Sequence, residues 1–438
     1  HRLPNGGFAD RWLGPRHRMP GYGMDTRKER GAGDFLSAVG WDYFPAWYTN
    51  PVKICIVTTA FPRWAGDFRA IFVYEAAQAL KRQGCRVRVI AMHNPGAKKR
   101  EEMDGVEVIR LPYAPRRWEV LQKDSAGIPA AWKQNPAARL LMLPFMAVHT
   151  WAVAKYAADC DIIHANWTLS AASAWASQWV HRRPFVVTVQ GSDIFQAPKI
   201  PLVRQATRLA LQRAGRVMAL SRSLADATAA LGIPGEKISV VPNGVNLANF
   251  PHQPGAPREP IILYAGTLIP RKGPDLLIRA MPEILARLPD YRLVLVGEGE
   301  MRPALESLTA ELNLGERVMF VGTQTQQQVG EWMRKSGVFV LPSYEEGQGV
   351  VLVEALASGT PCVGTTAGGI PDVVTEDVGT VVPPGDVSAL AQAIIQTLVD
   401  PVRWETLCRQ ARQRAETVYD WDQIAQGLIS IYKEVIGR

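Results

Sequence analysis

Residues 52–92 read VKICIVTTAFPRWAGDFRAIFVYEAAQALKRQGCRVRVIAM, and this stretch decides the fold. Its first eight residues form a short apolar and β-branched run, which is typical of a buried strand. Apolar residues at helical spacing then predict a helix over 72–82, which Gly84 ends, and residues 87–92 repeat the strand pattern. A strand, a helix and a second strand in this order predict parallel strands joined by a right-handed crossover.

The same alternation continues on both sides of a proline-rich linker. Strands are expected at 106–111, 162–165, 185–189 and 217–220, and then at 261–265, 292–296, 318–321, 338–341 and 361–364, with helices between most of them. This pattern predicts an α/β protein with two Rossmann-like doubly wound domains, 51–250 and 261–415, facing each other across a cleft. The linker 251–260 carries four prolines, and a helix within 416–438 is expected to cross back to the first domain. Residues 1–50 show no period and are expected to be a poorly ordered extension.

Composition excludes several protein classes. With 47% hydrophobic and 21% charged residues over 438 positions, the chain can bury large cores, so neither a disordered chain nor a small stapled module is expected. The five cysteines are far apart without a C-x-x-C pair, which argues against a zinc site or a disulfide framework. No apolar run is long enough to span a membrane and no secretory signal is recognisable, so we expect a cytoplasmic protein. Residues 140–154, interrupted by Pro144, predict a buried helix pair or a membrane-surface element.

Charge is distributed very unevenly along the chain. Residues 51–250 carry 26 Lys and Arg against 13 Asp and Glu, whereas residues 251–438 carry 16 against 23. A basic first half predicts an anionic partner, namely a phosphorylated acceptor, an anionic membrane surface contacted peripherally, or nucleic acid. A solvated basic face is the plain alternative. Because no aromatic-basic motif accompanies the charge, a nucleic-acid partner is not expected.

The most specific chemical motif is the segment 342–361, PSYEEGQGVVLVEALASGTP. Glu346 precedes a glycine-bearing loop, and Glu354 lies eight residues later on the helix that this loop opens. Backbone N–H groups of such a loop and the helix dipole attract phosphate, while a carboxylate accepts hydrogen bonds from sugar hydroxyls. The segment therefore predicts a nucleotide-sugar site, although Glu354 alone also fits a glutamate that complements its own helix dipole.

This segment and the two-sheet plan together resemble the retaining glycosyltransferases of the GT-B fold, family 4, over residues 52–438. The resemblance implies that Glu346 contacts the donor sugar and that Glu354 contacts the ribose. It also implies that the backbone around Gly349 and Val350 binds the donor diphosphate. The family loop usually reads E-G-F-G, whereas Gln348 stands here in place of the aromatic residue, so a more polar wall of the donor pocket is expected.

A second motif, residues 264–273 (YAGTLIPRKG), resembles the family's G-R-L-x-x-x-K-G at a strand end. In the family the arginine and the lysine neutralise the departing diphosphate. The resemblance implies this catalytic role for Lys272, together with Glu346. Thr267 replaces the family's arginine, and Arg271 is the candidate that supplies the missing charge.

The first domain carries matching loops. Gly66 corresponds to the family's donor-approaching glycine, and Arg63 and Arg69 are candidates to meet an anionic acceptor. Residues 188–193 (TVQGSD) resemble T-x-H-G-x-D, which implies a donor contact at Gln190 and Gly191. Asp193 is then expected to orient the loop or the acceptor, or to cap a turn. Since Gln190 replaces the family's histidine and cannot transfer a proton at neutral pH, we expect no histidine base there.

The resemblance implies a retaining, metal-independent transfer of a hexose from a UDP- or GDP-sugar to a hydroxyl acceptor. A lipid-linked or surface-polysaccharide intermediate is expected as the acceptor, with the nucleotide-sugar donor as substrate and no cofactor or metal. Two alternatives are a nucleotide-sugar epimerase or a phosphorylase of the same fold. A degenerate, non-catalytic sugar-nucleotide-binding protein is the third, which Thr267, Gln190 and Gln348 together favour.

Overall fold

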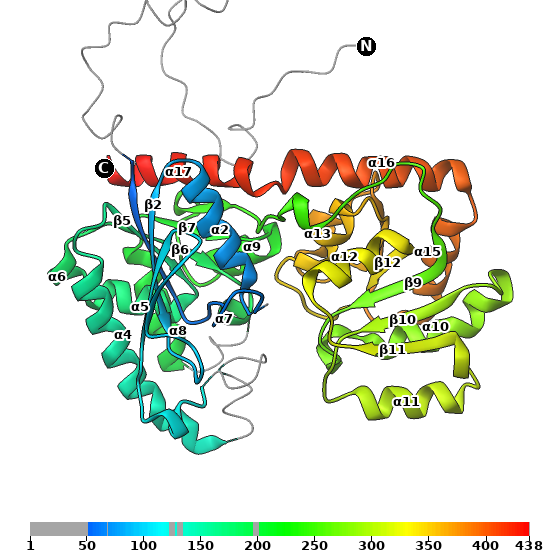
Figure 1. The fold of residues 1–438 in the computed structure, drawn as a ribbon, viewed down its shortest axis with the longest axis horizontal. Helices are drawn as coiled ribbons and strands as arrows, with labels where there is room; N and C mark the ends of the chain where they lie inside the picture. Colours follow the sequence, from blue (N-terminus) through cyan, green and yellow to red (C-terminus); the bar gives the residue numbers. More distant parts are fainter. Residues whose placement is uncertain (1–50, 68, 122–127, 129–134, 196–200, 438) are drawn as a thin grey trace, which may run out of the picture.

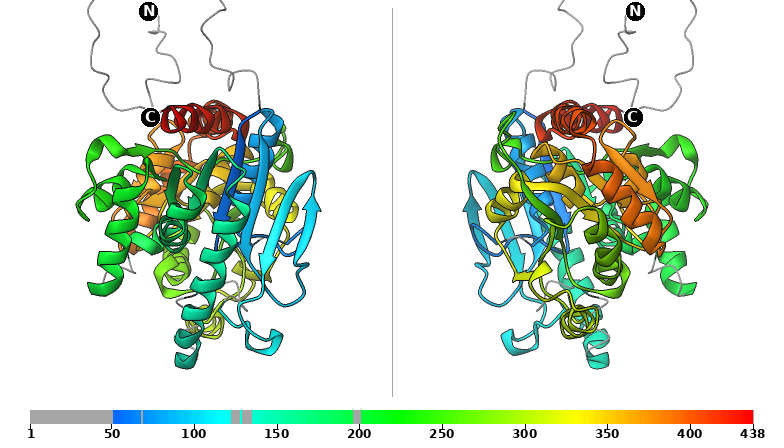
Figure 2. Two further views of the ribbon diagram at one scale, coloured as in Figure 1. Left: turned by 90° about the vertical axis from the view of Figure 1, so that its left-hand side faces the viewer. Right: turned by 90° about the vertical axis from the view of Figure 1, so that its right-hand side faces the viewer.

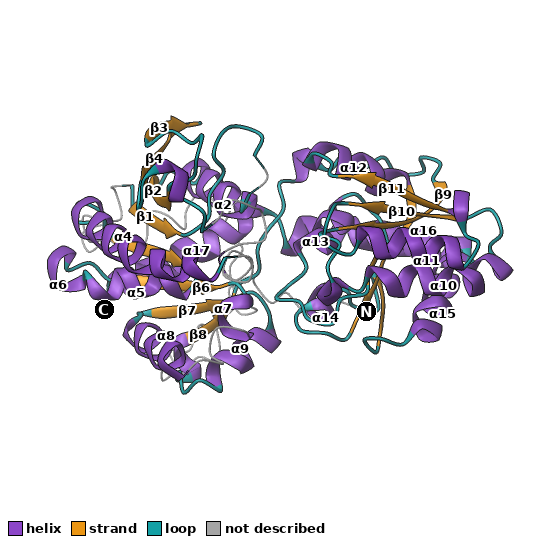
Figure 3. Cartoon of the chain, turned by 90° about the horizontal axis from the view of Figure 1, so that it is seen from below, coloured by secondary structure: helices purple, strands orange, loops and turns teal. Residues whose placement is uncertain are grey.

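A computed structural model describes residues 51–437 except 68, 122–127, 129–134 and 196–200. The expected extension over 1–50 lies outside the described residues. The described chain forms two α/β units side by side, each with helices on both faces of a central sheet (Figures 1 and 3). The α/β class with two doubly wound sheets, predicted from the strand and helix alternation, is confirmed.

The first sheet has eight strands in the order β3-β4-β2-β1-β5-β6-β7-β8, parallel except for β3. The strands are β1 (Lys53–Thr58), β2 (Arg86–Met92), β3 (Arg100–Met103), β4 (Val106–Leu111), β5 (Ile162–Asn166), β6 (Phe185–Val189), β7 (Arg216–Ala219) and β8 (Ile238–Val240). The helices are α2 (Ile71–Arg82), α4 (Met142–Tyr156), α5 (Thr168–Ala176), α6 (Gln178–His181), α7 (Ser192–Phe195), α8 (Pro201–Arg213) and α9 (Arg222–Ala229). The central strands are buried on both faces, as their unbroken apolar runs predict.

The second sheet has six strands in the order β11-β10-β9-β12-β13-β14, all parallel. Its strands are β9 (Glu259–Ala265), β10 (Arg292–Val296), β11 (Val318–Gly322), β12 (Ser336–Leu341), β13 (Cys362–Thr365) and β14 (Gly379–Val382). Its helices are α10 (Pro274–Arg287), α11 (Arg302–Glu311), α12 (Gln326–Lys335), α13 (Val350–Ala357), α14 (Ile370–Val373), α15 (Val387–Leu398) and α16 (Pro401–Val418). Strand β9 starts at Glu259, so the last two residues of the expected linker are already in the sheet.

The last helix, α17 (Trp421–Ile436), continues from α16 along one side of both units and packs on the first one (Figures 1 and 2). Its apolar face, including Trp421, Leu428 and Tyr432, is part of the same core cluster as strands β1 and β2 and helix α2. Gly244, next to the junction, is packed so closely that a Cβ atom there would lie 2.7 Å from the Trp421 ring. The chain therefore passes twice between the domains, once before β9 and once at α17.

Strand order reverses between β1 and β5 in the first sheet and between β9 and β12 in the second. Crevices at such reversals, outside the carboxyl ends of the strands, are where open α/β sheets bind ligands. The loops after β1, β6, β9 and β12 are those that carry the sequence motifs. The two domains also touch at neighbouring loops, where Arg222, after β7, and Asp372, after β13, form an ion pair at 2.7 Å.

Candidate functional site

Lys272 and Glu346 form an ion pair at the carboxyl edge of the second sheet. Lys272 ends a short 3-10 helix (Pro270–Lys272) after β9, and Glu346 lies in the loop after the neighbouring strand β12. The Lys272 Nζ donates to Glu346 Oε2, and the Gly347 N–H donates to Glu346 Oε1 at 3.2 Å. The two side chains that the sequence assigned to catalysis thus lie in contact and mostly shielded from water.

Arg271 lies beside the same loop. Its Nη1 donates to the Glu345 carbonyl oxygen at 3.1 Å, and the Tyr344 N–H donates to the Arg271 carbonyl at 2.9 Å. Burial raises the pKa of Tyr264, the Glu346 charge raises this pKa further and the Arg271 charge lowers it, so both charges lie near that phenol. The structure therefore brings Arg271, Lys272 and Glu346 together, whereas Thr267 contributes a backbone carbonyl that accepts from Tyr264 Oη at 3.0 Å.

Helix α13 begins next to this pair. Gly349, its N-cap, adopts a φ of 84°, and the Glu346 Cγ lies 3.5 Å from the position of a Cβ atom on Gly349. The first N–H groups of a helix, here those of Val350 and Val351, have no carbonyl partner within the helix, whereas the Leu352 N–H already donates to the Gly349 carbonyl at 2.8 Å. Positive φ and close packing explain a glycine at this position, and the N-terminus that it opens suits an anion.

Glu354 lies in the same helix and is buried in a carboxylate cluster that joins the domains. The amide Nε2 of Gln326, the first residue of α12, donates to Glu354 Oε1 at 3.1 Å and to Glu75 Oε1, on helix α2 of the first domain, at 3.4 Å. The Trp421 Nε1 donates to Glu75 Oε2 at 2.9 Å. Burial raises the pKa of Glu354 to about 7 and that of Glu75 to about 6, and the Glu75 charge further raises that of Glu354.

Sequence reasoning missed Glu75 and Gln326. The only available signal was an acidic residue on the apolar face of α2, where Val73, Ala76 and Leu80 are buried around it. Neither residue belongs to a local motif, because their contacts join segments that are distant in the sequence.

The raised pKa values predict a specific pH dependence of stability. A carboxyl whose folded pKa lies above its unfolded value stabilises the fold most when protonated, and this contribution is lost as pH rises through the folded pKa. The free energy of unfolding of the protein should therefore fall as pH rises from about 4.5 to 7. Glu75→Gln, which cannot ionise, should lose on the order of 2 kcal/mol less than the wild type over this range in urea unfolding. Identical pH profiles for the two proteins would contradict this assignment.

A chain of amide groups crosses between the domains beside this cluster. Gln190 Nε2 donates to Asn166 Oδ1 at 3.2 Å, and Asn243 Nδ2 donates to Gln190 Oε1 at 3.4 Å. The Asn243 N–H donates to Gln348 Oε1 at 2.8 Å, and Gln348 Nε2 donates to the Asn243 carbonyl at 2.9 Å. The two departures from the family pattern, Gln190 and Gln348, are thus linked through Asn243.

In this arrangement Gln348 does not lie on an open wall of the cleft, and its expected contribution to the donor pocket stays a prediction. The side chain is 2% exposed and pairs with the backbone of Asn243 instead. An amide carries both a donor and an acceptor, so it satisfies the N–H and the C=O of one residue at once, which an aromatic ring cannot do. Loss of this pairing in Gln348→Leu should therefore leave a buried N–H and C=O unpaired and lower the thermal midpoint, with Gln327→Leu on the exposed side of α12 as the control.

Gly191 and Gly347 bring the two domains into backbone contact. A Cβ atom on Gly347 would lie 2.6 Å from the Gln190 carbonyl oxygen, and one on Gly191, whose φ is 113°, would lie 3.1 Å from Gly347 Cα. Asp193 holds the first-domain side of this contact. Its Oδ1 accepts from the N–H groups of Gln190 and Gly191, each at 3.0 Å, and its Oδ2 accepts from the Thr168 N–H at 3.1 Å. Burial raises the Asp193 pKa to about 6. Asp193 therefore orients this loop, one of the roles expected for it.

The loop after β1 is held by its own ion pair. Arg63 Nε donates to the buried Asp67 Oδ2 at 2.7 Å, and the Arg63 guanidinium lies 4.0 Å above the Trp64 ring. Gly66 adopts a φ of 87° with open space around it, and Arg69 lies half-buried just before α2. Arg63 is thus engaged within its loop, and acceptor contacts by Arg63 and Arg69 remain predictions.

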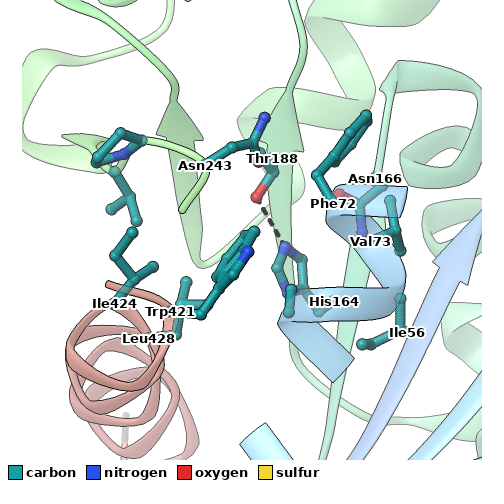
Figure 4. Close-up of a pocket in the computed structure, with 13 residues that line it drawn as sticks. Ile56, Phe72, Val73, His164, Asn166, Thr188, Asn243, Trp421, Ile424 and Leu428 are labelled. Atoms are coloured by element: carbon teal, nitrogen blue, oxygen red, sulfur yellow. Dashed lines mark hydrogen bonds between the residues drawn. The ribbon is translucent and has the colours of Figure 1, made fainter. Parts of the chain in front are cut away.

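A small cavity lies behind Asn243, lined from α2, β5, β6 and α17 (Figure 4). Its interior of about 20 Å³ holds about one water molecule, so it is too small for a nucleotide sugar. His164 faces it, with Nε2 2.7 Å from Thr188 Oγ1 and Nδ1 2.7 Å from Tyr432 Oη. Burial lowers the His164 pKa to about 4, so this histidine is neutral and serves the packing of α17.

Other features of the described residues bear on the predicted class. No group of three His, Cys, Asp or Glu side chains is placed to hold a metal ion among them. The five cysteines are free and buried. In the part of the chain that the structure describes, no helix has the length and apolarity needed to cross a membrane.

Two doubly wound domains in contact across an interdomain site have the GT-B fold, and the comparisons place the chain among glycosyltransferases. Residues 248–418 match the family model "Glycosyl transferases group 1", and residues 70–244 match "Glycosyl transferase 4-like domain". The chain belongs to the group 1 glycosyltransferases and is a transferase. The resemblance to this family, predicted from the sequence motifs, is confirmed.

Three similar proteins illustrate the range of the family. The chain is 30% identical to a D-inositol 3-phosphate glycosyltransferase of Kribbella flavida, over 62% of this chain and 71% of that one. It is also 30% identical to a GDP-mannose-dependent α-(1-6)-phosphatidylinositol monomannoside mannosyltransferase of Mycolicibacterium smegmatis, over 55% of this chain and 67% of that one. Among solved structures, sucrose-phosphate synthase of Thermosynechococcus elongatus is 25% identical and superposes with a TM-score of 0.72, over 88% of this chain and 99% of that one.

Proposed function

We propose that this glycosyltransferase moves a hexose from a UDP- or GDP-sugar to a hydroxyl of an anionic, lipid-linked acceptor, with retention at the anomeric carbon and without a metal ion. The observation that carries the proposal is the Lys272–Glu346 ion pair beside the N-terminus of α13. A lysine next to unpaired helix N–H groups suits a diphosphate, and an adjacent carboxylate suits sugar hydroxyls. A nucleotide sugar would then place its diphosphate on Lys272 and the helix N–H groups, and its hexose on Glu346.

The other half of the donor would reach Glu354. Gln326 orients this carboxylate through Oε1, and ribose hydroxyls are proposed to donate to it. The pKa of Glu354 is about 7, and ribose hydroxyls donate best to the ionised carboxylate. Donor binding should therefore strengthen as pH rises through this value. The donor base would then lie beyond Glu354 and the diphosphate between Glu354 and Lys272.

The proposed chemical step takes place on one face of the sugar. The bond between the anomeric carbon and the diphosphate oxygen breaks, and the bond to the acceptor oxygen forms on the same face. The acceptor proton passes to the departing phosphate oxygen, since the amide of Gln190 cannot take it. Negative charge grows on the diphosphate, where Lys272, Arg271 and the α13 N–H groups would stabilise it. Closure of the domains would exclude water that otherwise hydrolyses the donor.

Two observations support an anionic acceptor. The first domain carries a large excess of lysine and arginine over acidic residues. In addition, both relatives above are named for acceptors that contain an inositol phosphate. A basic domain raises the local concentration of such an acceptor and its association rate.

A panel of UDP-, GDP- and ADP-sugars in EDTA tests the donor half of the proposal. We expect one nucleotide sugar to raise the thermal midpoint of the wild type and to raise that of Glu354→Ala much less. With that donor, proton NMR of the product should show the anomeric configuration of the donor. Inversion, or activity that disappears in EDTA, would contradict the proposed route. Absence of any stabilisation by all donors would instead favour a protein that has lost catalysis.

A further inference from the structure

Helix α4 exposes an apolar stripe that the transfer reaction does not use. Leu140, at the end of the preceding 3-10 helix (Pro136–Leu141), is 74% exposed, Leu143 is 76% exposed and Trp151 is 52% exposed. With Ala147 these residues recur every three or four positions and share one face. The opposite face, with Phe145, His149, Ala152 and Val153, is buried. The helix is thus apolar on both sides, and one of them meets solvent.

Helix α6 extends this surface. It packs on α4 and carries Trp179, 80% exposed, and Val180, 46% exposed. Both helices lie on the side of the first domain that is remote from the second domain (Figures 1 and 3). We call Leu140, Leu143, Trp151, Trp179 and Val180 the apolar face. Large exposed apolar side chains on two helices that pack together are characteristic of an interaction surface.

Positive charge surrounds the apolar face and acidic residues are scarce. Arg139 precedes Leu140, Arg182 follows Val180 and is exposed, and Lys155 Nζ lies 4.9 Å from the Trp151 ring centroid. The sequence has no Asp or Glu in 135–158 or in 162–192. Two acidic residues lie between these segments: Asp159 pairs with Arg88 at 2.5 Å, and Asp161 accepts from the Lys53 N–H at 2.8 Å. Tryptophan and leucine flanked by lysine and arginine suit the boundary between acyl chains and anionic headgroups.

The apolar face also reaches the edge of the sheet that carries the site. Helix α4 lies in the connection between the parallel strands β4 and β5 and runs back along the sheet, so its N-terminal end, with Leu140 and Leu143, lies toward the carboxyl ends of the strands (Figure 1). The loop of Gly191 and Asp193 lies at the same edge. A surface bound along α4 would therefore be next to the acceptor side of the cleft.

We propose that α4 and α6 dock the protein on the surface of an anionic lipid bilayer through the apolar face and its flanking cations. The docking does not depend on the proposed chemistry, because it uses no residue of the interdomain site. Docking would hold a lipid-linked acceptor and the enzyme in the same plane.

Co-sedimentation of the full chain with vesicles tests this proposal. We expect binding to phosphatidylcholine vesicles that contain about one third phosphatidylglycerol, weakened by high salt and weak on phosphatidylcholine alone. Leu143→Ser/Trp151→Ser/Trp179→Ser should bind at least about tenfold less. The matched control is Val402→Ser, which removes an equally exposed apolar side chain (75%) from the second domain and should bind as the wild type does.

Three results would overturn the docking proposal. They are the absence of wild-type binding to the anionic vesicles, equal binding by the triple variant, and a wild-type dimer in solution that the triple variant abolishes. The last result would make a second copy of the chain the occupant. Donor-dependent thermal stabilisation of the triple variant should equal that of the wild type, which separates failure of docking from failure of the donor site.

Discussion

Lys272→Met is expected to lower kcat by about 100-fold to 1,000-fold, the usual loss when one group that stabilises transition-state charge is removed. Among the described residues, Lys272 is the cation that contacts the Glu346 carboxylate directly. The pair lies beside the N-terminus of α13, where the diphosphate is proposed to depart. Steady-state transfer assays with the donor found in the panel measure the effect. Lys272→Arg should recover part of the activity because it restores the charge but not the geometry of an ammonium.

Arg279→Met is the matched control for Lys272→Met. Arg279 lies on helix α10, which follows Lys272, and its half-exposed side chain is 3.8 Å from the Asp275 carboxylate. It should retain wild-type kcat. The double variant Glu346→Gln/Lys272→Met should lower kcat by less than the two single variants do when their effects are multiplied, since the pair acts as a unit. A kcat for Lys272→Met within about threefold of the wild type would remove this lysine from the transition state.

Gly347→Ala should lower kcat/KM by about 100-fold through the contact between the domains rather than through the chemistry. Its Cβ atom would lie 2.6 Å from the Gln190 carbonyl oxygen across the cleft, a distance that forces the domains apart. Displacements of about 1 Å at a reacting centre can cost this much. The thermal midpoint should change little, whereas the radius of gyration from small-angle X-ray scattering with donor bound should increase.

Gly315→Ala provides the control for this prediction. Gly315 lies in the second domain with open space around it, so an alanine there meets no neighbour. Wild-type kcat/KM in the Gly347→Ala variant would mean that transfer does not require the arrangement in which Gly191 and Gly347 touch.

Local patterns were enough to predict most of the fold. Strands β4, β6 and β10 begin and end where the sequence predicts, because short apolar or alternating runs mark each of them directly. The strands that were missed lack this signal. Strand β3 reads REEM, an edge strand with polar side chains, β8 has only the three residues ISV, and β14 reads GTVV and opens with a glycine. Their place is set by pairing with β4, β7 and β13 rather than by their own composition.

The candidate site was predictable only where motifs are local. Lys272, Glu346 and Glu354 lie in short motifs whose spacing reports a loop and a helix start. Glu75, by contrast, reaches Gln326 251 residues away and Trp421 346 residues away, and no local pattern records such distances. The orientation of Gln348 toward Asn243 depends on the same closed arrangement of the domains. The residues that sequence reasoning missed, Glu75 and Gln326, therefore act through a contact between the domains.

The most direct test of the proposed donor site is a crystal structure of the protein with the nucleoside diphosphate that stabilises it best. We expect the β-phosphate within hydrogen-bond distance of the N–H of Gly349 or Val350 and of Lys272 Nζ, with the ribose hydroxyls on Glu354. A diphosphate bound elsewhere, with the Lys272–Glu346 pair unchanged and Glu354 still enclosed by Gln326 and Glu75, would contradict it.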